Sequence, residues 1–141
     1  MNYVKSCGFI VYKLINNEIY YLVIKSINGD VGFPKGHMEY NESEVETAIR
    51  EVKEETNIDV NIVCDFRHLI EYKLVNKIDT IKQSIYFIGK AINDDIIPLK
   101  TEVLGASFIP FNKAIELLTF KETKEMLVNA NKFIINLIKT S

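Results

Sequence analysis

Residues 43–57, which read SEVETAIREVKEETN, constrain the fold of this chain more than any other segment. Ser43 and Glu46 have the spacing of a capping box, in which a hydroxyl and a carboxylate satisfy the free amides at the start of a helix. Asn57 tolerates the left-handed conformation that ends many helices. An apolar stripe at helical spacing is formed by Val45, Ala48, Ile49 and Val52. The sequence therefore predicts a helix that begins at Ser43, stops at Asn57 and buries one face.

Apolar, β-branched segments on both sides of this helix predict strands. Residues 7–14 and 19–24 form an expected hairpin around the turn Asn16-Asn17, and residues 31–42 are an expected ordered loop. Further strands are expected at residues 58–64, 66–74, 83–91 and 105–109, with helices at 111–118 and 121–139. The last helix should turn inward Met126, Leu127, Ala130, Phe133, Ile134, Leu137 and Ile138. Strands with interspersed helices indicate a layered α/β or α+β domain.

The composition limits the classes of function that remain open. With 141 residues the chain suits one domain, spanning 1–141. A formal net charge of −2 provides no basic field, so broad nucleic-acid binding is not expected. Cys7 and Cys64 lack metal-site spacing and are expected to be buried free thiols. No signal-peptide pattern or membrane-length apolar run is present, so we expect a cytoplasmic protein with no membrane partner.

The carboxylates near the end of the predicted helix carry the first chemical signal. At about 100° per residue, Glu51, Glu54 and Glu55 fall within an arc of about 100°. Like charges at this spacing repel, and the helix C-terminus disfavours anions. A divalent cation would reverse both effects, and oxygen ligands alone favour Mg²⁺ or Mn²⁺. The alternative is a solvated acidic face on which Arg50 pairs with Glu54.

The residues around this cluster resemble a known family. The spacing G-x5-E-x7-R-E-x2-E-E is formed by Gly36, Glu42, Arg50, Glu51, Glu54 and Glu55. With apolar Val52 and Ile58 in their places, it resembles the box of the Nudix hydrolases, a loop and helix that bind metal at a pyrophosphate. One departure is Asn57, where the family usually has glycine. Asparagine tolerates the same backbone conformation.

The resemblance implies a fold and a mechanism. The fold would be an α/β/α sandwich with a mixed sheet between helices. Metal ligation or deprotonation of water would be carried out by Glu51, Glu54 and Glu55, with the Gly36 carbonyl as a further ligand. Arg50 and Glu42 would hold the helix in position. Glu102, in the loop PLKTEVLG, would supply another metal ligand or the base, unless it is an ordinary loop carboxylate.

A looser resemblance extends over most of the chain. The segments GFPKGHMEYNES, EYKL and LLTFKETKEML are similar to asymmetrical diadenosine tetraphosphate hydrolases, which implies cleavage to ATP and AMP. Lys35, His37 and Lys82 would then contact phosphate oxygens, with exposed polar residues as the alternative. Tyr72 and Phe120 would stack on an adenine ring, with core packing as the alternative.

Other functions stay open at this point. The same box would serve an RNA 5′ pyrophosphohydrolase, although that substrate favours more basic surface. It would also serve a nucleoside triphosphate or sugar-nucleotide pyrophosphohydrolase. A non-catalytic nucleotide-sensing domain is the alternative from another class, but such domains commonly lose box carboxylates. Tyr86 is expected in the core and His68 in a structural role, and the sequence leaves the oligomeric state open.

Overall fold

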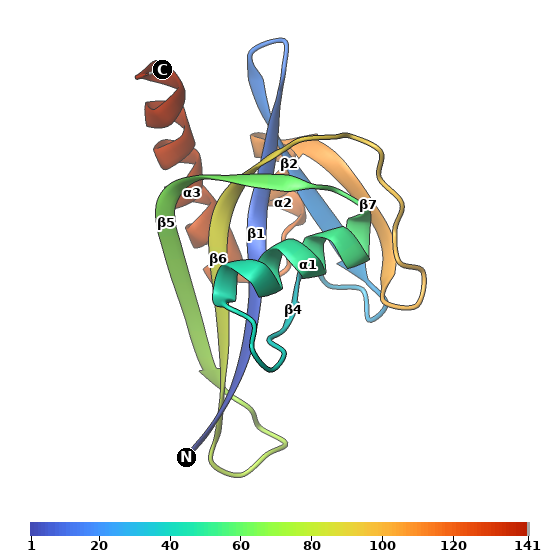
Figure 1. The fold of residues 1–141 in the computed structure, drawn as a ribbon, viewed down its shortest axis with the longest axis vertical. Helices are drawn as coiled ribbons and strands as arrows, with labels where there is room; N and C mark the ends of the chain where they lie inside the picture. The colour runs from blue at the N-terminus through green and yellow to red at the C-terminus, as the bar shows by residue number, and fades with distance from the viewer. Residues whose placement is uncertain (141) are drawn as a thin grey trace.

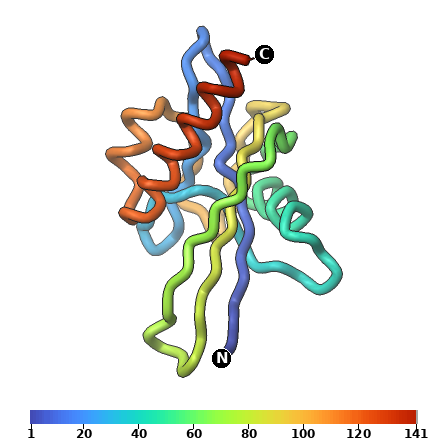
Figure 2. The backbone as a smooth tube through the Cα atoms, turned by 90° about the vertical axis from the view of Figure 1, so that its left-hand side faces the viewer, coloured from blue at the N-terminus to red at the C-terminus, as the bar shows by residue number. Residues whose placement is uncertain are grey.

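The computed structural model describes residues 1–140, which form a seven-stranded sheet between two helical layers (Figures 1 and 2). The strands are β1 (Asn2–Ile15), β2 (Glu18–Ser26), β3 (Val31–Gly32), β4 (Lys35–His37), β5 (Val60–Lys73), β6 (Thr80–Ala91) and β7 (Val103–Pro110). The helices are α1 (Glu44–Thr56), α2 (Phe111–Leu117) and α3 (Lys121–Lys139). In Figure 2, α1 lies on one side of the sheet and α2 and α3 lie on the other. The expected α/β/α sandwich is therefore confirmed.

The sheet is mixed, as expected. Its main path runs β3-β2-β1-β6-β5, while β4 pairs with β1 and β7 pairs with β2. β1 and β6 are parallel along residues 2–12, and the other pairs are antiparallel. The edge of β1 is shared: Ser6 to Gly8 pair with β4, whereas Tyr12 to Ile15 pair with β2. This arrangement brings the short strand β4 beside the middle of the sheet.

Each face of the sheet carries its own hydrophobic core. Phe9 and Val11 point toward α1, where they meet buried side chains that include Ala48, Val52, Ile58, Ile85 and Phe87. Ile10 and Tyr12 point toward the other layer, where the buried side chains include Tyr86, Ile88, Leu118, Met126, Leu127, Ala130 and Ile134. Successive residues of a strand face opposite sides. The apolar run of β1 is continuous because both of its faces are covered.

Helix α1 has the boundaries that its local signals predict. The Ser43 side chain accepts a hydrogen bond from the Glu46 amide at 3.1 Å, and the Ser43 amide donates to the Glu46 carboxylate at 2.8 Å. Asn57 ends the helix with φ 67°, in the left-handed region. The predicted position of Ile49 is wrong, because its side chain is 40% exposed. The sheet meets only the side of α1 that carries Ala48 and Val52.

Other expectations are corrected by long-range pairing. The two strands predicted at 58–64 and 66–74 are one strand, β5, whose pairing with β6 shifts register between Ile62 and Arg67. A bulge of this kind absorbs extra residues without ending the strand. The expected loop at 31–42 contains β3 and β4. Phe133 is 40% exposed and packs edge-on against Phe66, with ring centroids 5.6 Å apart.

Both cysteines are free thiols, as expected. Cys7 is fully buried, and burial raises its pKa to about 11. The expectation that Cys64 is also buried is wrong, because this residue is only half-buried. Within residues 1–140, no helix combines the length and the apolar character needed to cross a membrane.

Asn57 tests how the end of α1 is fixed. Asn57→Ala is expected to lower the free energy of unfolding by about 1–2 kcal/mol, because alanine is strained in the left-handed region. This variant also loses the hydrogen bond of 2.9 Å that the Asn57 side-chain amide donates to the Asp95 carbonyl. Asn57→Gly loses only that hydrogen bond and should cost less. Urea denaturation measures both variants, and equal losses would show that the backbone conformation contributes nothing.

Candidate active site

The Arg50 guanidinium joins α1 to the loop before it. Nε and Nη2 donate to the two Glu42 carboxylate oxygens at 2.5 and 2.9 Å, and Nη2 also donates to the His37 carbonyl at 2.9 Å. Nη1 donates to Glu51 at 2.9 Å and to Glu54 at 3.1 Å. The hydrogen bonds from Arg50 lower the pKa of Glu42 to about 2. One side chain thus connects the loop, the end of β4 and two carboxylates of the helix.

Gly36 lies directly against the Glu51 carboxylate. A Cβ atom added at Gly36 would lie 2.0 Å from the Glu51 carboxyl carbon, which is far inside van der Waals contact. Gly36 is held in this place by β4, since it pairs with Cys7 of β1. A side chain at position 36 would therefore displace the Glu51 carboxylate from the place that it occupies beside glycine.

The glutamates of α1 differ in their environments. Glu51 is 9% exposed and Glu55 is 7% exposed. Burial, and after it repulsion from Glu51, raises the pKa of Glu55 to about 8. A hydrogen bond of 3.2 Å from the Lys35 backbone amide acts in the opposite direction and lowers this pKa. Burial also raises the pKa of Glu51. The Glu54 side chain is 49% exposed. Two carboxylates are therefore buried close together, and a third lies at the surface beside them.

Glu102 lies in the segment that covers the end of α1. In this segment the Leu99 amide donates to the Glu55 carbonyl at 3.0 Å, and the Ile97 amide donates to the Thr56 carbonyl at 2.9 Å. Glu102 is exposed, and its charge contributes to the raised pKa values of Glu51 and Glu55. The structure therefore brings Glu102 into the electrostatic neighbourhood of the helix carboxylates.

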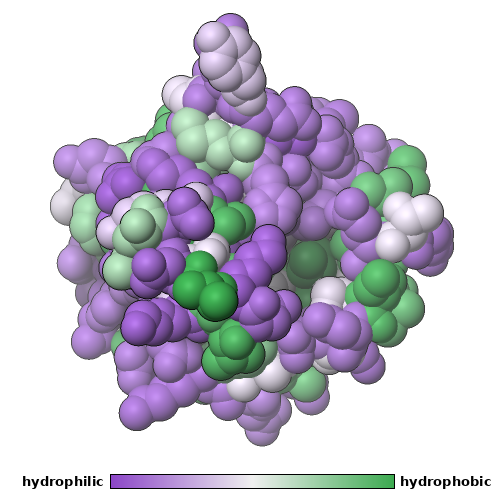
Figure 3. Space-filling view, turned by 90° about the horizontal axis from the view of Figure 1, so that it is seen from below, coloured by the Kyte–Doolittle hydropathy of each residue, from purple (hydrophilic) through white to green (hydrophobic). Residues whose placement is uncertain are grey.

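A pocket of about 580 Å³ begins at Glu55 and extends between the sheet and α3. Lys35, Tyr72, Tyr86 and Phe120 also line it. Tyr72 is 51% exposed and Phe120 is 52% exposed, so neither ring belongs to the core. Figure 3 shows that the end of the molecule carrying the β5–β6 loop is hollowed, with hydrophobic patches beside polar surface. The two aromatic residues expected to meet a base thus lie in one cavity with a carboxylate of α1.

Thr119 fixes the loop that carries Phe120. Its hydroxyl accepts a hydrogen bond from the Val31 amide at 2.7 Å, and its own amide donates to the Val31 carbonyl at 3.1 Å. Phe120 follows Thr119 directly and is the N-cap residue, immediately before α3. The loop is therefore attached to the edge strand β3, and Phe120 is placed at the rim of the pocket.

Basic side chains gather at the same end of the sheet. Lys82 is 9% exposed and donates to the Ser6 hydroxyl at 2.6 Å. Burial, together with the nearby charge of Lys35, lowers its pKa to about 8. Burial likewise lowers the pKa of Lys35. His37 is exposed, and its pKa is lowered by desolvation, then by Lys82 and Lys35. The three residues predicted to contact phosphate therefore lie within electrostatic reach of one another.

Sequence reasoning missed two features of this region. Tyr86 is buried as expected, but it also lines the pocket, and its ring packs edge-on against Phe33 with centroids 6.3 Å apart. Ser6 was not singled out, although it is the hydrogen-bond partner of Lys82. The available signal was the alternation along β6, which places positions 82 and 86 on one face. His68 stacks against Phe66 on β5, which agrees with a structural role.

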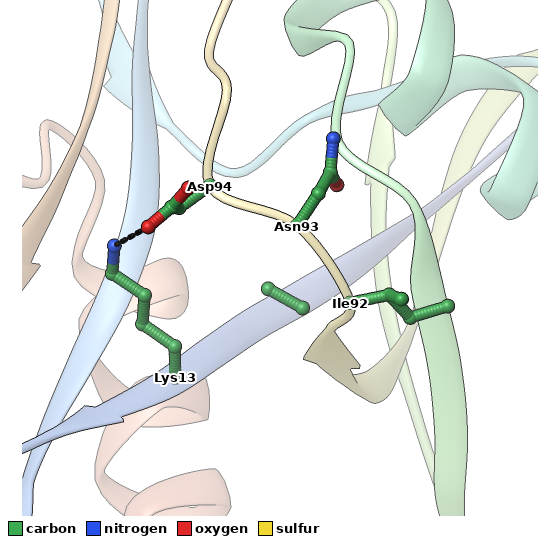
Figure 4. A pocket seen from close by; sticks show the side chains of 5 residues that line it. Lys13, Ile92, Asn93 and Asp94 are labelled. Carbon is green, nitrogen blue, oxygen red and sulfur yellow. Dashed lines mark ion pairs between the residues drawn. The ribbon is translucent and has the colours of Figure 1, made fainter.

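A second, smaller cavity lies away from the carboxylates. It measures about 220 Å³ and is lined by Lys13 at the far end of β1 and by residues 91–94 after β6. Figure 4 shows Lys13 reaching toward Asp94, and the two charged groups are 3.9 Å apart. None of the predicted site residues lines this cavity.

Comparison with known proteins identifies the family of this chain. Residues 7–129 match the NUDIX domain. The chain is 30% identical over 142 residues to a Sus scrofa protein named bis(5′-nucleosyl)-tetraphosphatase (asymmetrical), covering 92% of this chain and 95% of the relative. A similar Caenorhabditis elegans protein with the same name is 27% identical over 136 residues, covering 93% and 96%.

Solved structures give the same result. A binary complex of the Caenorhabditis elegans Ap4A hydrolase superposes with a TM-score of 0.85 at 27% identity, covering 94% of this chain and 98% of that one. The NUDIX domain of Shewanella oneidensis NrtR, solved with ADP ribose, shares the fold alone, with a TM-score of 0.73 at 11% identity over 95% and 90% of the two chains. The chain therefore belongs to the Nudix family and is a Nudix hydrolase.

Proposed function

We propose that this chain hydrolyses a pyrophosphate bond of a dinucleoside polyphosphate, cleaving diadenosine tetraphosphate to ATP and AMP. The observation that carries the proposal is the shared cavity of Glu55, Tyr72 and Phe120. It provides one continuous space for a phosphate chain beside the carboxylate helix and for a nucleobase beside two aromatic rings. The names of the relatives support the same class of substrate.

The metal of this reaction would be Mg²⁺, with Mn²⁺ as a substitute. Nudix hydrolases generally use divalent metals of this kind. The charge of Glu51 raises the proton affinity of buried Glu55, and the oxygen-only donor set fits a hard cation. Within residues 1–140, no three acidic, histidine or cysteine side chains already converge on one point. The proposed ligands are Gly36, Glu51, Glu54 and Glu55. The bound ion would neutralise phosphate charge and make water more acidic.

The remaining roles fall to side chains of the chain itself. Glu54 is exposed and oriented by Arg50, so it is our candidate for accepting the proton of the attacking water. Glu102 is the alternative base, since its charge acts on the same helix carboxylates. Lys35, His37 and Lys82 would bind phosphate oxygens. Arg50 and Glu42 would take no part in the chemical step; their hydrogen bonds to each other hold α1 against the preceding loop.

Tyr72 and Phe120 would hold an adenine ring between them. They come from β5 and from the residue before α3, and both are half exposed at the same pocket. Stacking of a base on an aromatic side chain contributes about 1–3 kcal/mol per contact. An RNA end is a less suitable substrate for this chain, because its net charge is −2. A purely sensing role conflicts with the presence of all three box glutamates.

Product analysis tests the proposed reaction. Incubation with diadenosine tetraphosphate and Mg²⁺ should yield ATP and AMP in equal amounts, with no product in the presence of a chelator. Glu54→Gln and Glu55→Gln should each lower kcat by about 10²-fold or more, since each loses a carboxylate needed for proton transfer or metal binding. Glu116→Gln, at an exposed position of α2, is the matched control. Cleavage of triphosphorylated RNA alone would contradict the proposed substrate, and near-normal rates in both variants would contradict the role of α1.

The aromatic pair has its own test. Tyr72→Ala and Phe120→Ala should each raise KM for diadenosine tetraphosphate about 5- to 100-fold, which corresponds to the loss of one stacking contact. Tyr72→Phe and Phe120→Tyr keep a ring and should retain most of the affinity. Tyr40→Ala removes a tyrosine that is 93% exposed and serves as the control. Steady-state kinetics would refute the clamp if the alanine variants matched this control.

Glu55 should make the stability of the metal-free protein depend on pH. The folded state keeps the Glu55 proton up to about pH 8, whereas an unperturbed glutamate loses it near 4.5. Between these values the folded state binds one more proton, so the free energy of unfolding should fall by about 1.4 kcal/mol per pH unit as pH rises. Urea denaturation with chelator measures this slope. Glu55→Gln should flatten it and Glu116→Gln should not, while an unchanged slope in Glu55→Gln would disprove the assignment.

A further inference from the structure

Lys82 is a buried lysine without an acidic partner. Its side chain is 9% exposed, and no aspartate or glutamate of residues 1–140 forms an ion pair with it. Burial of an ammonium group away from water is costly unless other groups bind it. In the described part of the chain, its hydrogen bond to the Ser6 hydroxyl is the contact that serves this purpose. A position that is unfavourable for folding in this way suggests a ligand.

Ser6 lies where three strands meet. On β1 it pairs with His37 of β4 on one side and with Ser84 of β6 on the other. Lys82 is two residues before Ser84 on the parallel neighbour, so its side chain shares a face with that of Ser6. Ser6 is 1% exposed, and its hydroxyl therefore has little access to water. Ser6 therefore lies between His37 and Lys82, which are both proposed to bind phosphate.

Within residues 1–140, the groups around the ammonium supply it with no negative charge. Lys35 and His37 on β4 carry or acquire positive charge, and Lys35 disfavours the charged form of Lys82. Tyr72, which pairs with Lys82 from β5, is not a carboxylate. The Ser6 hydroxyl accepts one of the three ammonium protons. The other two protons are available to phosphate oxygens.

We propose that Ser6 is a positioning residue, whose hydroxyl holds the Lys82 ammonium in the orientation that binds the phosphate chain of the substrate. This inference rests on the proposed function, because it assumes that polyphosphate occupies this end of the pocket. Ser6 does not touch the reacting atoms. Its loss should therefore weaken substrate binding much more than it slows the chemical step.

A double-mutant cycle separates this role from a general structural one. Ser6→Ala should raise KM for diadenosine tetraphosphate roughly tenfold, the effect of losing one hydrogen bond to a charged group, with kcat changed less than twofold. Lys82→Met should raise KM by more. Ser6→Ala in the Lys82→Met background should then have no further effect, because Ser6 acts through the ammonium. Additive effects of the two substitutions would overturn the proposal.

Two measurements do not depend on turnover. In protein labelled with ¹³C at lysine Cε, the Lys82 signal, assigned by its loss in Lys82→Arg, should titrate at lower pH in Ser6→Ala, because the hydroxyl favours the charged form. Ser6→Thr retains a hydroxyl and should restore the titration. Calorimetry with inorganic tripolyphosphate should show about tenfold weaker binding to Ser6→Ala. Unchanged urea denaturation would confirm that the variant folds.

The outcomes distinguish this inference from the proposed function. If the chain fails to cleave diadenosine tetraphosphate but Ser6→Ala weakens tripolyphosphate binding, the positioning role stands and the proposed substrate is wrong. If Ser6→Ala leaves tripolyphosphate affinity and the Lys82 titration unchanged, Ser6 does not position Lys82, whatever the substrate.

Discussion

The site depends on the five donors of the Arg50 guanidinium. Its planar group meets the Glu42 carboxylate with two parallel hydrogen bonds and still reaches the His37 carbonyl, Glu51 and Glu54. A lysine has one point charge and three donors, so it could not make this set of contacts at once. The guanidinium also supplies positive charge among several carboxylates. Loop, strand and helix are thereby fixed relative to one another by one side chain.

Two different strands pair with the same edge of β1. Near residue 7 the neighbour of β1 is β4, and from residue 12 onward the neighbour is β2. Gly36 is thus placed against Glu51, with no room for a side chain between them. Glu55 belongs to the helical layer on one face of the sheet, yet it borders a pocket whose other residues, such as Tyr86, belong to the opposite face. The pocket is therefore lined by residues from both layers of the sandwich.

The features that the sequence predicts correctly are those with local causes. The boundaries of α1 follow from Ser43, Glu46 and Asn57, all within or next to the helix. Features that depend on distant partners were not predictable in this way. The continuity of β5 depends on its pairing with β6, and the contact between Lys82 and Ser6 joins residues 76 positions apart. Resemblance to a family pointed to Tyr72 and Phe120, but only the fold places both at one pocket.

The attachment of Phe120 to the sheet has a consequence for how the pocket exchanges its contents. β3 has two residues, and the loop carrying Phe120 joins it through two hydrogen bonds of Thr119. Opening this short edge would also disturb one of the two hydrophobic cores, because Val31 packs against the core that contains Phe33 and Leu118. Widening of the pocket at this rim is therefore coupled to the core beneath α3, as well as to the backbone hydrogen bonds of β3.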